Sequence, residues 1–414
     1  MLTKLYIDGF RLWTDATIRF QRGLPTVLIG PNGSGKTTIL EVMAFLSAAA
    51  SDGLRAAVYD ARGGPSEFFA AGKSRMQLSA WLDSRPGLPT EADRGPVRYE
   101  LTLMRDGPFA RVEKETISVY KRGLEQPPLY VVEREQSRCR LRNVSTRKWE
   151  PLAVDDDQSL VFELIRQDQH YPTLRHVRES LSRLRVYAGF STQPRWALDN
   201  QERAQSSRNA IVVQPQGALD PRGRNLVNAL YTLQQRDEHK WNYLLRQMAA
   251  EFPYCRRITF PPEPGGSKLA LAWQDDRFSE LRSAEQMSEG MWSFLLLLAA
   301  LLPAEPAELI AFDEPDAHLH PSALRRLVSL LEEASSHSTV VFTSHSSRVL
   351  DELEEPARSL LVCEPTDDGT SILQLDPEQA KAWLDEYEGV GRLRDHGLLD
   401  KGNSLDTLSP LLLA

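Results

Sequence analysis

A glycine-rich corner, GPNGSGKTT, separates two apolar segments near the start of the chain. The segment before it, residues 24–29, has the composition of a buried strand, and the segment after it, ILEVMAFLSAAA, that of a helix. Gly30, Gly35, Lys36 and Thr37 satisfy the spacing G-x-x-x-x-G-K-S/T of a phosphate-binding loop. Because this loop requires a strand before it and a helix after it, the sequence predicts an α/β nucleotide-binding fold.

The chemistry of phosphate binding explains each residue type in the loop. Glycine reaches left-handed dihedral angles, so successive backbone N–H groups can surround a phosphate, and the following helix directs the positive end of its dipole at the same anion. Lys36 would reach the β- and γ-phosphates, and the Thr37 hydroxyl would bind Mg²⁺. We therefore expect the loop to bind nucleotide through Gly30, Asn32, Gly33, Ser34, Gly35, Lys36, Thr37 and Thr38.

A second apolar strand pattern, ELIAF, leads into two adjacent carboxylates, Asp313 and Glu314. In P-loop ATPases the first acid holds Mg²⁺, and a following glutamate can orient or polarise the attacking water. Another buried-strand pattern, STVVFTSHSS, ends in polar residues beside His345. At the carboxyl end of a neighbouring parallel strand, His345 could reach a γ-phosphate. The sequence predicts Thr37 and Asp313 as metal ligands, and Lys36, Glu314 and His345 as catalytic residues.

Bulk properties exclude several classes of protein. The net charge of −8 gives no global positive field for nucleic acid, so any DNA contact needs a local basic patch. The three cysteines contain no C-x-x-C pair, which argues against a disulfide framework or a zinc site. The most apolar run, residues 291–302, is too short to cross a bilayer, and the first residues lack a signal-peptide core. We expect a cytoplasmic protein without membrane contact.

Hydrophobic periodicity predicts the order of secondary structure. The expected elements are an opening hairpin over residues 2–20, a loop with short helices over 51–74, an antiparallel sheet over 76–154, helices over 156–184, one long amphipathic helix over 225–252, a hairpin over 256–273, and a helix, strand, helix and strand over 284–350.

Ser288, Glu289 and Gly290 stand directly before the apolar helical run. A hydroxyl and free N–H groups at a helix start can form an anion site, but serine is also a favoured plain N-cap. Spacing alone leaves both alternatives open.

In their order along the chain, these motifs resemble those of ATPase heads of the ABC, SMC and RecF kind. Residues 30–38 match the Walker A loop, 288–290 a divergent signature motif without the usual second glycine and glutamine, 309–314 Walker B, 315–321 the D-loop, and His345 the switch histidine. The opening IDGFRLWTDATIRF and the stretch EPDAHLHP are similar to the OLD and RecF-like branch of stand-alone bacterial AAA-type ATPases. Arg11 matches a position there that can contact nucleotide, and Gln77 is a weak candidate for the Q-loop.

The resemblance implies ATP and Mg²⁺ as cofactors and an ABC/SMC-type head with a mixed central sheet, an antiparallel β-lobe and a helical lobe. We expect a single head over residues 1–365 and a C-terminal appendage over 366–414. Within the head, the Walker A lobe would span 1–50, a β-rich and helical insertion 75–190, and the signature and Walker B lobe 220–365.

The resemblance also implies a homodimer, or a higher oligomer, in which two heads pack head-to-tail around two ATP molecules. Ser288 and Gly290 of one subunit would then contact the nucleotide that Lys36 of the other holds. A dimer that forms with ATP and separates after hydrolysis would act as a switch. No heptad pattern supports an SMC arm, and only 69 residues follow His345, too few for the nuclease domain of OLD nucleases.

Two functional classes remain from the sequence. In the first, the ATPase works in a DNA-directed or phage-defence complex beside a separate effector protein, either as a hydrolysing switch or as a non-catalytic ATP-gated scaffold. In the second, it binds DNA directly, as in RecF-like repair. A basic surface would favour direct DNA binding, because contacts with DNA phosphates need clustered cations. The expected duplex contacts are Arg134, Arg138, Arg140, Arg142, Arg147 and Lys148, and a second basic group is Arg166, Arg175, Arg178, Arg183 and Arg185.

Overall fold

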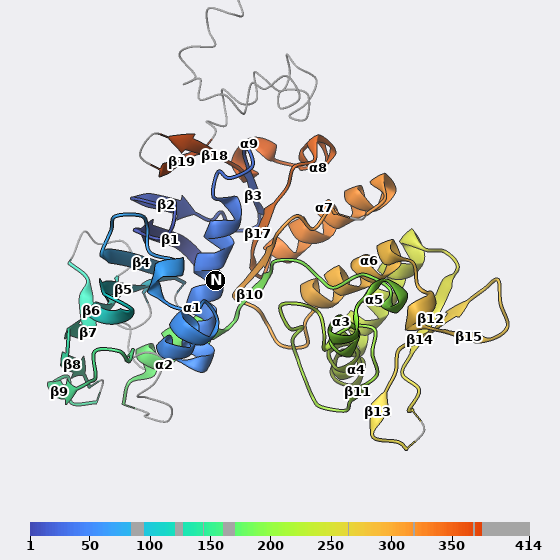
Figure 1. The fold of residues 1–414 in the computed structure, drawn as a ribbon, viewed down its shortest axis with the longest axis horizontal. Coiled ribbons are helices and arrows are strands. Elements are labelled where there is room, and N and C mark those ends of the chain that lie inside the picture. The colour runs from blue at the N-terminus through green and yellow to red at the C-terminus, as the bar shows by residue number, and fades with distance from the viewer. Residues whose placement is uncertain are drawn as a thin grey trace, which may run out of the picture.

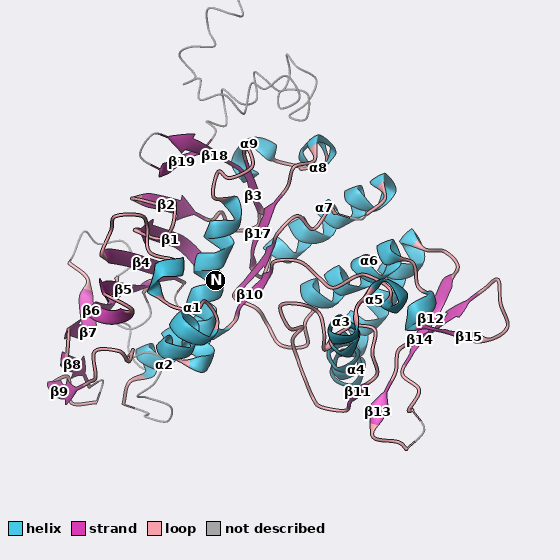
Figure 2. Ribbon diagram, viewed as in Figure 1, coloured by secondary structure: helices cyan, strands magenta, loops and turns pink. Residues whose placement is uncertain are grey.

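The computed structural model describes residues 1–83, 95–120, 127–143, 145–159, 170–263, 265–317, 319–366 and 369–374. Within these ranges the chain forms a six-stranded sheet, an eight-stranded sheet, two small sheets and the helices that cover them (Figures 1 and 2).

The six-stranded sheet carries the strands that end at the sequence motifs. Its order is β10-β16-β17-β3-β18-β19; the first five strands run parallel, and β19 pairs antiparallel with β18. Every residue of the three central strands is buried, which explains why their sequences are continuous apolar runs. The bounds are β3 Thr26–Ile29, β10 Leu184–Tyr187, β16 Leu309–Phe312, β17 Thr339–Thr343, β18 Leu360–Thr366 and β19 Gly369–Gln374.

Alternate residues of these strands face two separate hydrophobic clusters. Leu309 and Ala311 pack in the cluster that contains the buried face of α1 (Lys36–Asp52). Ile310 and Phe312 pack in the cluster that contains α6 (Glu289–Leu301) and α7 (Pro321–Ser335). This alternation follows from the two-residue period of a strand, and it places α1 on one face of the sheet and α6 and α7 on the other.

The eight-stranded sheet is antiparallel throughout, in the order β2-β1-β4-β5-β6-β7-β8-β9. It confirms the predicted β-lobe, and the opening hairpin joins it at one edge. The bounds are β1 Leu2–Asp8, β2 Ala16–Arg19, β4 Arg75–Leu82, β5 Val97–Asp106, β6 Phe109–Val119, β7 Leu129–Glu135, β8 Arg138–Arg142 and β9 Trp149–Ala153.

The helical lobe differs from the prediction in one respect. Residues 225–252 form two helices, α4 (Leu226–Arg236) and α5 (Glu238–Glu251), so the single long helix was wrong. The break lies at Asp237, whose φ of −144° leaves the helical region and whose side chain accepts a hydrogen bond from the N–H of Lys240. Aspartate favours such caps because it satisfies an otherwise unpaired N–H group at a helix start.

The apolar run before Pro303 forms α6, which is buried from Met291 to Leu301. In the portion of the chain with described structure, the helices are too short or too polar to span a bilayer. The remaining elements are α2 Pro172–Ser182, α3 Asn200–Ala204, α8 Ser347–Asp351, α9 Pro356–Ser359, the short helices Ala56–Asp60, Pro65–Glu67, Arg195–Ala197 and Ala284–Gln286, and the strands β11 Ile211–Val212, β12 Cys255–Thr259, β13 Lys268–Leu269, β14 Ala272–Asp275 and β15 Leu281–Ser283.

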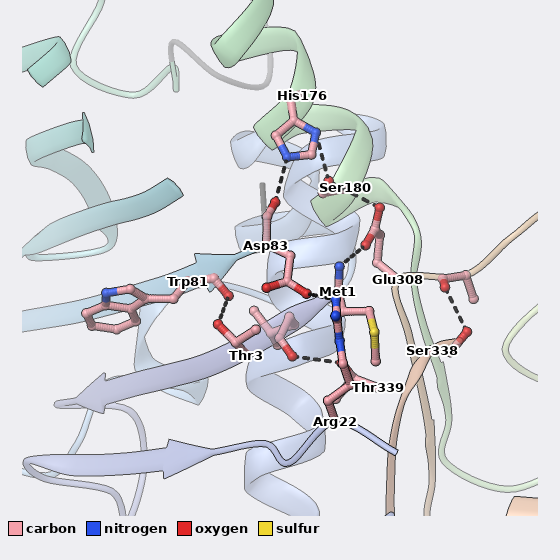
Figure 3. A network of polar contacts seen from close by, with 12 residues as sticks. Met1, Thr3, Arg22, Trp81, Asp83, His176, Ser180, Glu308, Ser338 and Thr339 are labelled. Atoms are coloured by element: carbon pink, nitrogen blue, oxygen red, sulfur yellow. Dashed lines mark hydrogen bonds and ion pairs between the residues drawn. The ribbon is translucent and has the colours of Figure 1, made fainter. Parts of the chain in front are cut away.

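A polar network joins the two large sheets at the end remote from the motifs (Figure 3). The amino group of Met1 lies 2.6 Å from Glu308 Oε2, directly before β16, and Thr339 Oγ1 at the start of β17 donates to the carbonyl of Leu2 at 2.7 Å. Burial raises the pKa of Glu308, but the hydrogen bond and charge of the amino group, together with the charges of His176 and Arg183, outweigh it and lower the pKa. The network fixes β1 to the first residues of the strands that carry the motifs.

Candidate nucleotide-binding site

The loop between β3 and α1 has backbone angles that glycine favours. Gly30, Gly33 and Gly35 have φ values of 143°, 79° and 82°. A Cβ atom at Gly30 would lie 2.2 Å from the carbonyl oxygen of Cys363, and one at Gly35 would lie 2.9 Å from Trp13 Nε1. The loop therefore needs glycine at both positions for space as well as for conformation.

Trp13 packs against this loop, a contact that the sequence did not predict. Its buried indole donates a hydrogen bond to the carbonyl of Gly35 at 3.0 Å. Nothing in the local pattern around Trp13 signals this contact, because the two residues lie 22 positions apart.

The side chains of the loop fit a phosphate group. Lys36 is buried, and its Nζ donates to the carbonyls of Gly30 and Pro31, both at 2.9 Å, so the ammonium lies within the loop. Ser34 Oγ is fully buried and has no hydrogen-bond partner among the described residues, as expected for a group that contacts a bound ligand. The other predicted binding residues are placed as follows: Asn32 and Gly33 are exposed at the tip of the loop, and Thr38 is buried in the first turn of α1.

Thr37 meets the end of β16. Its Oγ1 lies 3.2 Å and 3.1 Å from the two carboxylate oxygens of Asp313, which follows the last residue of that strand. A hydroxyl and a carboxylate are the oxygen donors that Mg²⁺ prefers, with substrate phosphates completing the shell. Among the described residues no cluster of three His, Cys, Asp or Glu side chains could hold a metal.

Glu314 and His345 face each other at the ends of β16 and β17. His345 Nε2 lies 3.4 Å from Glu314 Oε1, and both side chains are partly exposed. Glu314 has a φ of 47°, an uncommon value for a residue other than glycine, and its N–H donates to Thr343 Oγ1 at 2.8 Å. Thr343 also contacts Asp313, and it is a second residue that the sequence interpretation missed.

A cavity of about 310 Å³ opens beside these carboxylates. Its lining combines the Tyr187 and Phe312 rings, stacked 5.2 Å apart, with Asp313, Glu314 and the segment that follows β10. Gln77, the weak Q-loop candidate, lies on β4, where it pairs with Asp8 and Thr102 in the eight-stranded sheet.

Arg11 lies against the helix that follows the loop. Its Nη1 is 2.8 Å from Glu41 Oε2 on α1, and its Nε donates to the carbonyl of Glu67 at 3.0 Å. Like Glu314, it has a positive φ of 47°. A contact between Arg11 and nucleotide remains a prediction.

Ser288 is the N-cap of α6, and its exposed Oγ accepts a hydrogen bond from the N–H of Met291 at 3.2 Å. Arg208 braces the preceding turn: its buried guanidinium donates to the carbonyls of Ala284 and Met287 and lies 4.7 Å from the centre of the Trp292 ring. Gly290 lies in the first turn of the helix. Ser288 therefore acts as a helix N-cap in the structure, and an anion-binding role of this turn stays a prediction.

The predicted basic patch needs one correction. Arg134 is buried and donates to Glu115 Oε2 at 3.3 Å and to the carbonyls of Asp155 and Gln158, so it cannot contact DNA phosphates. Its burial follows from the alternation along β7, which turns this arginine toward the interior. Arg140 is engaged as well, because it forms an ion pair with Glu133 and lies 4.8 Å from the centre of the Trp149 ring.

Apart from Arg134, the cations of that patch keep access to solvent: Arg138, Arg140, Arg147 and Lys148 are exposed, and Arg142 is half-buried. In the second basic group, Arg178 donates to the carbonyl of Ala50. Arg166 and the part of the expected C-terminal appendage from residue 375 lie outside the described residues.

The family described as "AAA domain, putative AbiEii toxin, Type IV TA system" matches residues 26–351. A curated relative, the phosphate import ATP-binding protein PstB of Thermotoga maritima, is 38% identical over 79 residues, which make up 19% of this chain. The matched part spans only 31% of the length of that relative.

Solved SMC heads have a similar fold. The SMC head bound to the C-winged helix domain of ScpA has a TM-score of 0.54 at 13% identity, over 92% of this chain and 99% of that one. The SMC head domain from Thermotoga maritima has a TM-score of 0.45 at 14% identity, over 91% and 99% of the two chains. Identities this low show the fold alone. The family match over most of the chain shows that it belongs to the P-loop ATPase family described as "AAA domain, putative AbiEii toxin, Type IV TA system", and the likeness to the ScpA-bound SMC head shows that it has the fold of an ABC- and SMC-type head.

Proposed function

We propose that this protein binds ATP with Mg²⁺ and hydrolyses it to ADP and phosphate. The observation that carries the proposal is the convergence of Thr37, Asp313, Glu314 and His345 at one edge of the parallel sheet. These residues come from three different parts of the chain, and ligand sites in α/β proteins lie at this edge.

In this proposal each residue has one task. Lys36 and the loop N–H groups hold the phosphates, and Thr37 and Asp313 hold the metal ion. Mg²⁺, when bound, neutralises charge on the phosphates. Glu314 orients a water molecule and accepts its proton, while His345 contacts the γ-phosphate and holds the Glu314 carboxylate in place.

We further propose that two heads associate around ATP and separate after hydrolysis. The likeness to SMC heads and the positions of α1 and α6 on opposite faces of the sheet support this arrangement. A second chain could then bring Ser288 to the nucleotide held by Lys36.

We assign the switch to an OLD- or RecF-like system with a separate effector protein, as in phage defence. The toxin–antitoxin system in the family description supports a partner of this kind. Direct DNA binding has less support, since Arg134 is buried and Arg140 is paired.

Phosphate release and binding of a fluorescent ATP analogue test the proposal. Lys36→Ala should lose nucleotide binding, whereas Glu314→Gln should bind ATP but turn over about 10²–10⁴-fold more slowly, because it lacks a proton acceptor. Glu305→Gln is a matched control, because Glu305 is an exposed carboxylate whose ion pair, 3.8 Å from Arg236, lies on the surface. Wild-type turnover in Glu314→Gln would contradict the catalytic assignment.

A further inference from the structure

Thr343, the last residue of β17, joins the two carboxylate residues at the end of β16. Its side chain is fully buried. Its Oγ1 donates to Asp313 Oδ1 at 2.7 Å and accepts from the backbone N–H of Glu314 at 2.8 Å. The hydroxyl of Thr343 therefore donates to one, and accepts from the other, of two consecutive residues that follow the neighbouring strand.

The bond to Glu314 holds an unfavourable backbone conformation. At a φ of 47° the residue lies in the left-handed region, which costs free energy in residues with a Cβ atom unless the surroundings enforce it. The preceding N–H, that of Asp313, donates to the carbonyl of Tyr187 at 3.0 Å. The backbone of the pair is thus fixed from β10 on one side and from β17 on the other.

The bond to Asp313 fixes the direction of its carboxylate. Oδ1 receives the Thr343 hydroxyl, and Oδ2 lies 3.1 Å from Thr37 Oγ1 at the start of α1. Thr343 thereby adds a second hydroxyl contact to this carboxylate, beside that of Thr37, and restricts its rotation. Outer contacts of this kind orient metal ligands in many proteins.

We propose that Thr343 is a positioning residue for the paired carboxylates: it directs Asp313 toward the metal position and sets the backbone of Glu314. This inference rests on the proposed ATP hydrolysis. The sequence conceals it, because Thr343 closes the pattern TVVFT, in which threonine is an ordinary strand residue.

The test compares Thr343→Val, which replaces the hydroxyl by a methyl group of similar shape, with Thr343→Ser, which keeps the hydroxyl. Two quantities are measured: steady-state turnover, and the Mg²⁺ concentration that half-saturates binding of a fluorescent ATP analogue in the Glu314→Gln background, where hydrolysis does not interfere. We expect Thr343→Val to lower kcat about 10–100-fold and raise the Mg²⁺ midpoint about tenfold, with KM for ATP at saturating Mg²⁺ nearly unchanged. Thr343→Ser should restore both values.

Thr339→Val is the matched control. Thr339 lies at the other end of the same strand, is also buried, and donates one hydrogen bond, to the carbonyl of Leu2. It should lose stability without a change in kcat or in the Mg²⁺ midpoint. If Thr343→Val does not fold, the pair Thr343→Ala and Thr343→Ser carries the same comparison.

Failure of the positioning role and failure of the proposed ATP hydrolysis give different results. Wild-type values of kcat and of the Mg²⁺ midpoint in Thr343→Val would overturn the positioning role while leaving ATP hydrolysis intact. Absence of Mg²⁺-dependent ATP binding and hydrolysis in the unmodified chain would overturn the proposed function, and the inference with it.

Discussion

His345 Nε2 lies 3.4 Å from Glu314 Oε1, across the ends of two adjacent parallel strands. The contact joins residues that follow β16 and β17, and the register of these strands, in which Phe312 pairs with Phe342, brings the two strand ends side by side. A histidine in this position can hold the glutamate side chain and also reach a phosphate beyond it.

We therefore predict that His345→Gln lowers ATP turnover about 100-fold while ATP binding stays near the wild-type value. The physical reason is that the Glu314 carboxylate would lose the group that orients it. Phosphate release and equilibrium binding measure the two effects separately. His337→Gln is the control, because His337 is exposed after α7, and equal turnover of the two variants would contradict the role of His345.

A second prediction concerns composite sites. Lys36→Ala and Ser288→Arg chains should each be inactive alone, because every site in either homodimer lacks one half. In the mixed dimer, Lys36 of the Ser288→Arg chain meets Ser288 of the Lys36→Ala chain and forms one whole site. Recovered phosphate release on mixing would show that sites are shared between subunits.

The mass of Glu314→Gln with and without ATP checks the dimer directly. Bound ATP would add several charge-assisted hydrogen bonds between the subunits, each worth about 1.5–3 kcal/mol, enough to shift the equilibrium by orders of magnitude. A strictly monomeric species at saturating ATP and micromolar protein would rule out the switch.

The buried ion pair gives a third prediction. Arg134→Met leaves the Glu115 carboxylate buried without its cation, which should destabilise the fold by about 3–5 kcal/mol. Denaturant unfolding measures this loss. Arg138→Met, on the same lobe but exposed, should change stability by no more than about 0.5 kcal/mol. Equal stability of the two variants would show that Arg134 is not in the interior.

A fourth prediction uses pH. Arg277 donates to both carboxylate oxygens of Asp275, at 2.8 Å and 2.7 Å, and these bonds lower the pKa of Asp275 from 3.8 to about 2. A carboxyl whose pKa is lower in the folded than in the unfolded state stabilises the fold at a pH above its unfolded-state pKa. This contribution disappears as the pH falls through the folded-state pKa.

Arg277→Met should consequently lower Tm at pH 5–8, and its difference from the wild type should narrow between about pH 4 and pH 2. Thermal unfolding across this range measures the difference. Arg256→Met, which removes another exposed arginine from the same small sheet, should change Tm little. A Tm difference for Arg277→Met that stays constant down to pH 2 would contradict the pKa assignment.

The sequence by itself determined the position of the glycine-rich loop and of the apolar strands that lead into the motifs. The phosphate-binding loop is encoded within nine consecutive residues, because glycine at fixed positions dictates local backbone angles. The strands before Asp313 and His345 are short apolar runs, which only a sheet covered on both faces can bury. Their parallel alignment then follows from the general rules of α/β folds.

Only the tertiary structure decided which side chains meet across long sequence separations. Arg134 belongs to a basic segment, yet its strand turns it inward to Glu115, 19 residues away. Trp13 and Thr343 are ordinary residues in their own segments, and they gain their contacts with Gly35 and Asp313 from the packing of distant elements. Burial and side-chain partners depend on how strands pair and faces pack, and a local pattern carries no record of either.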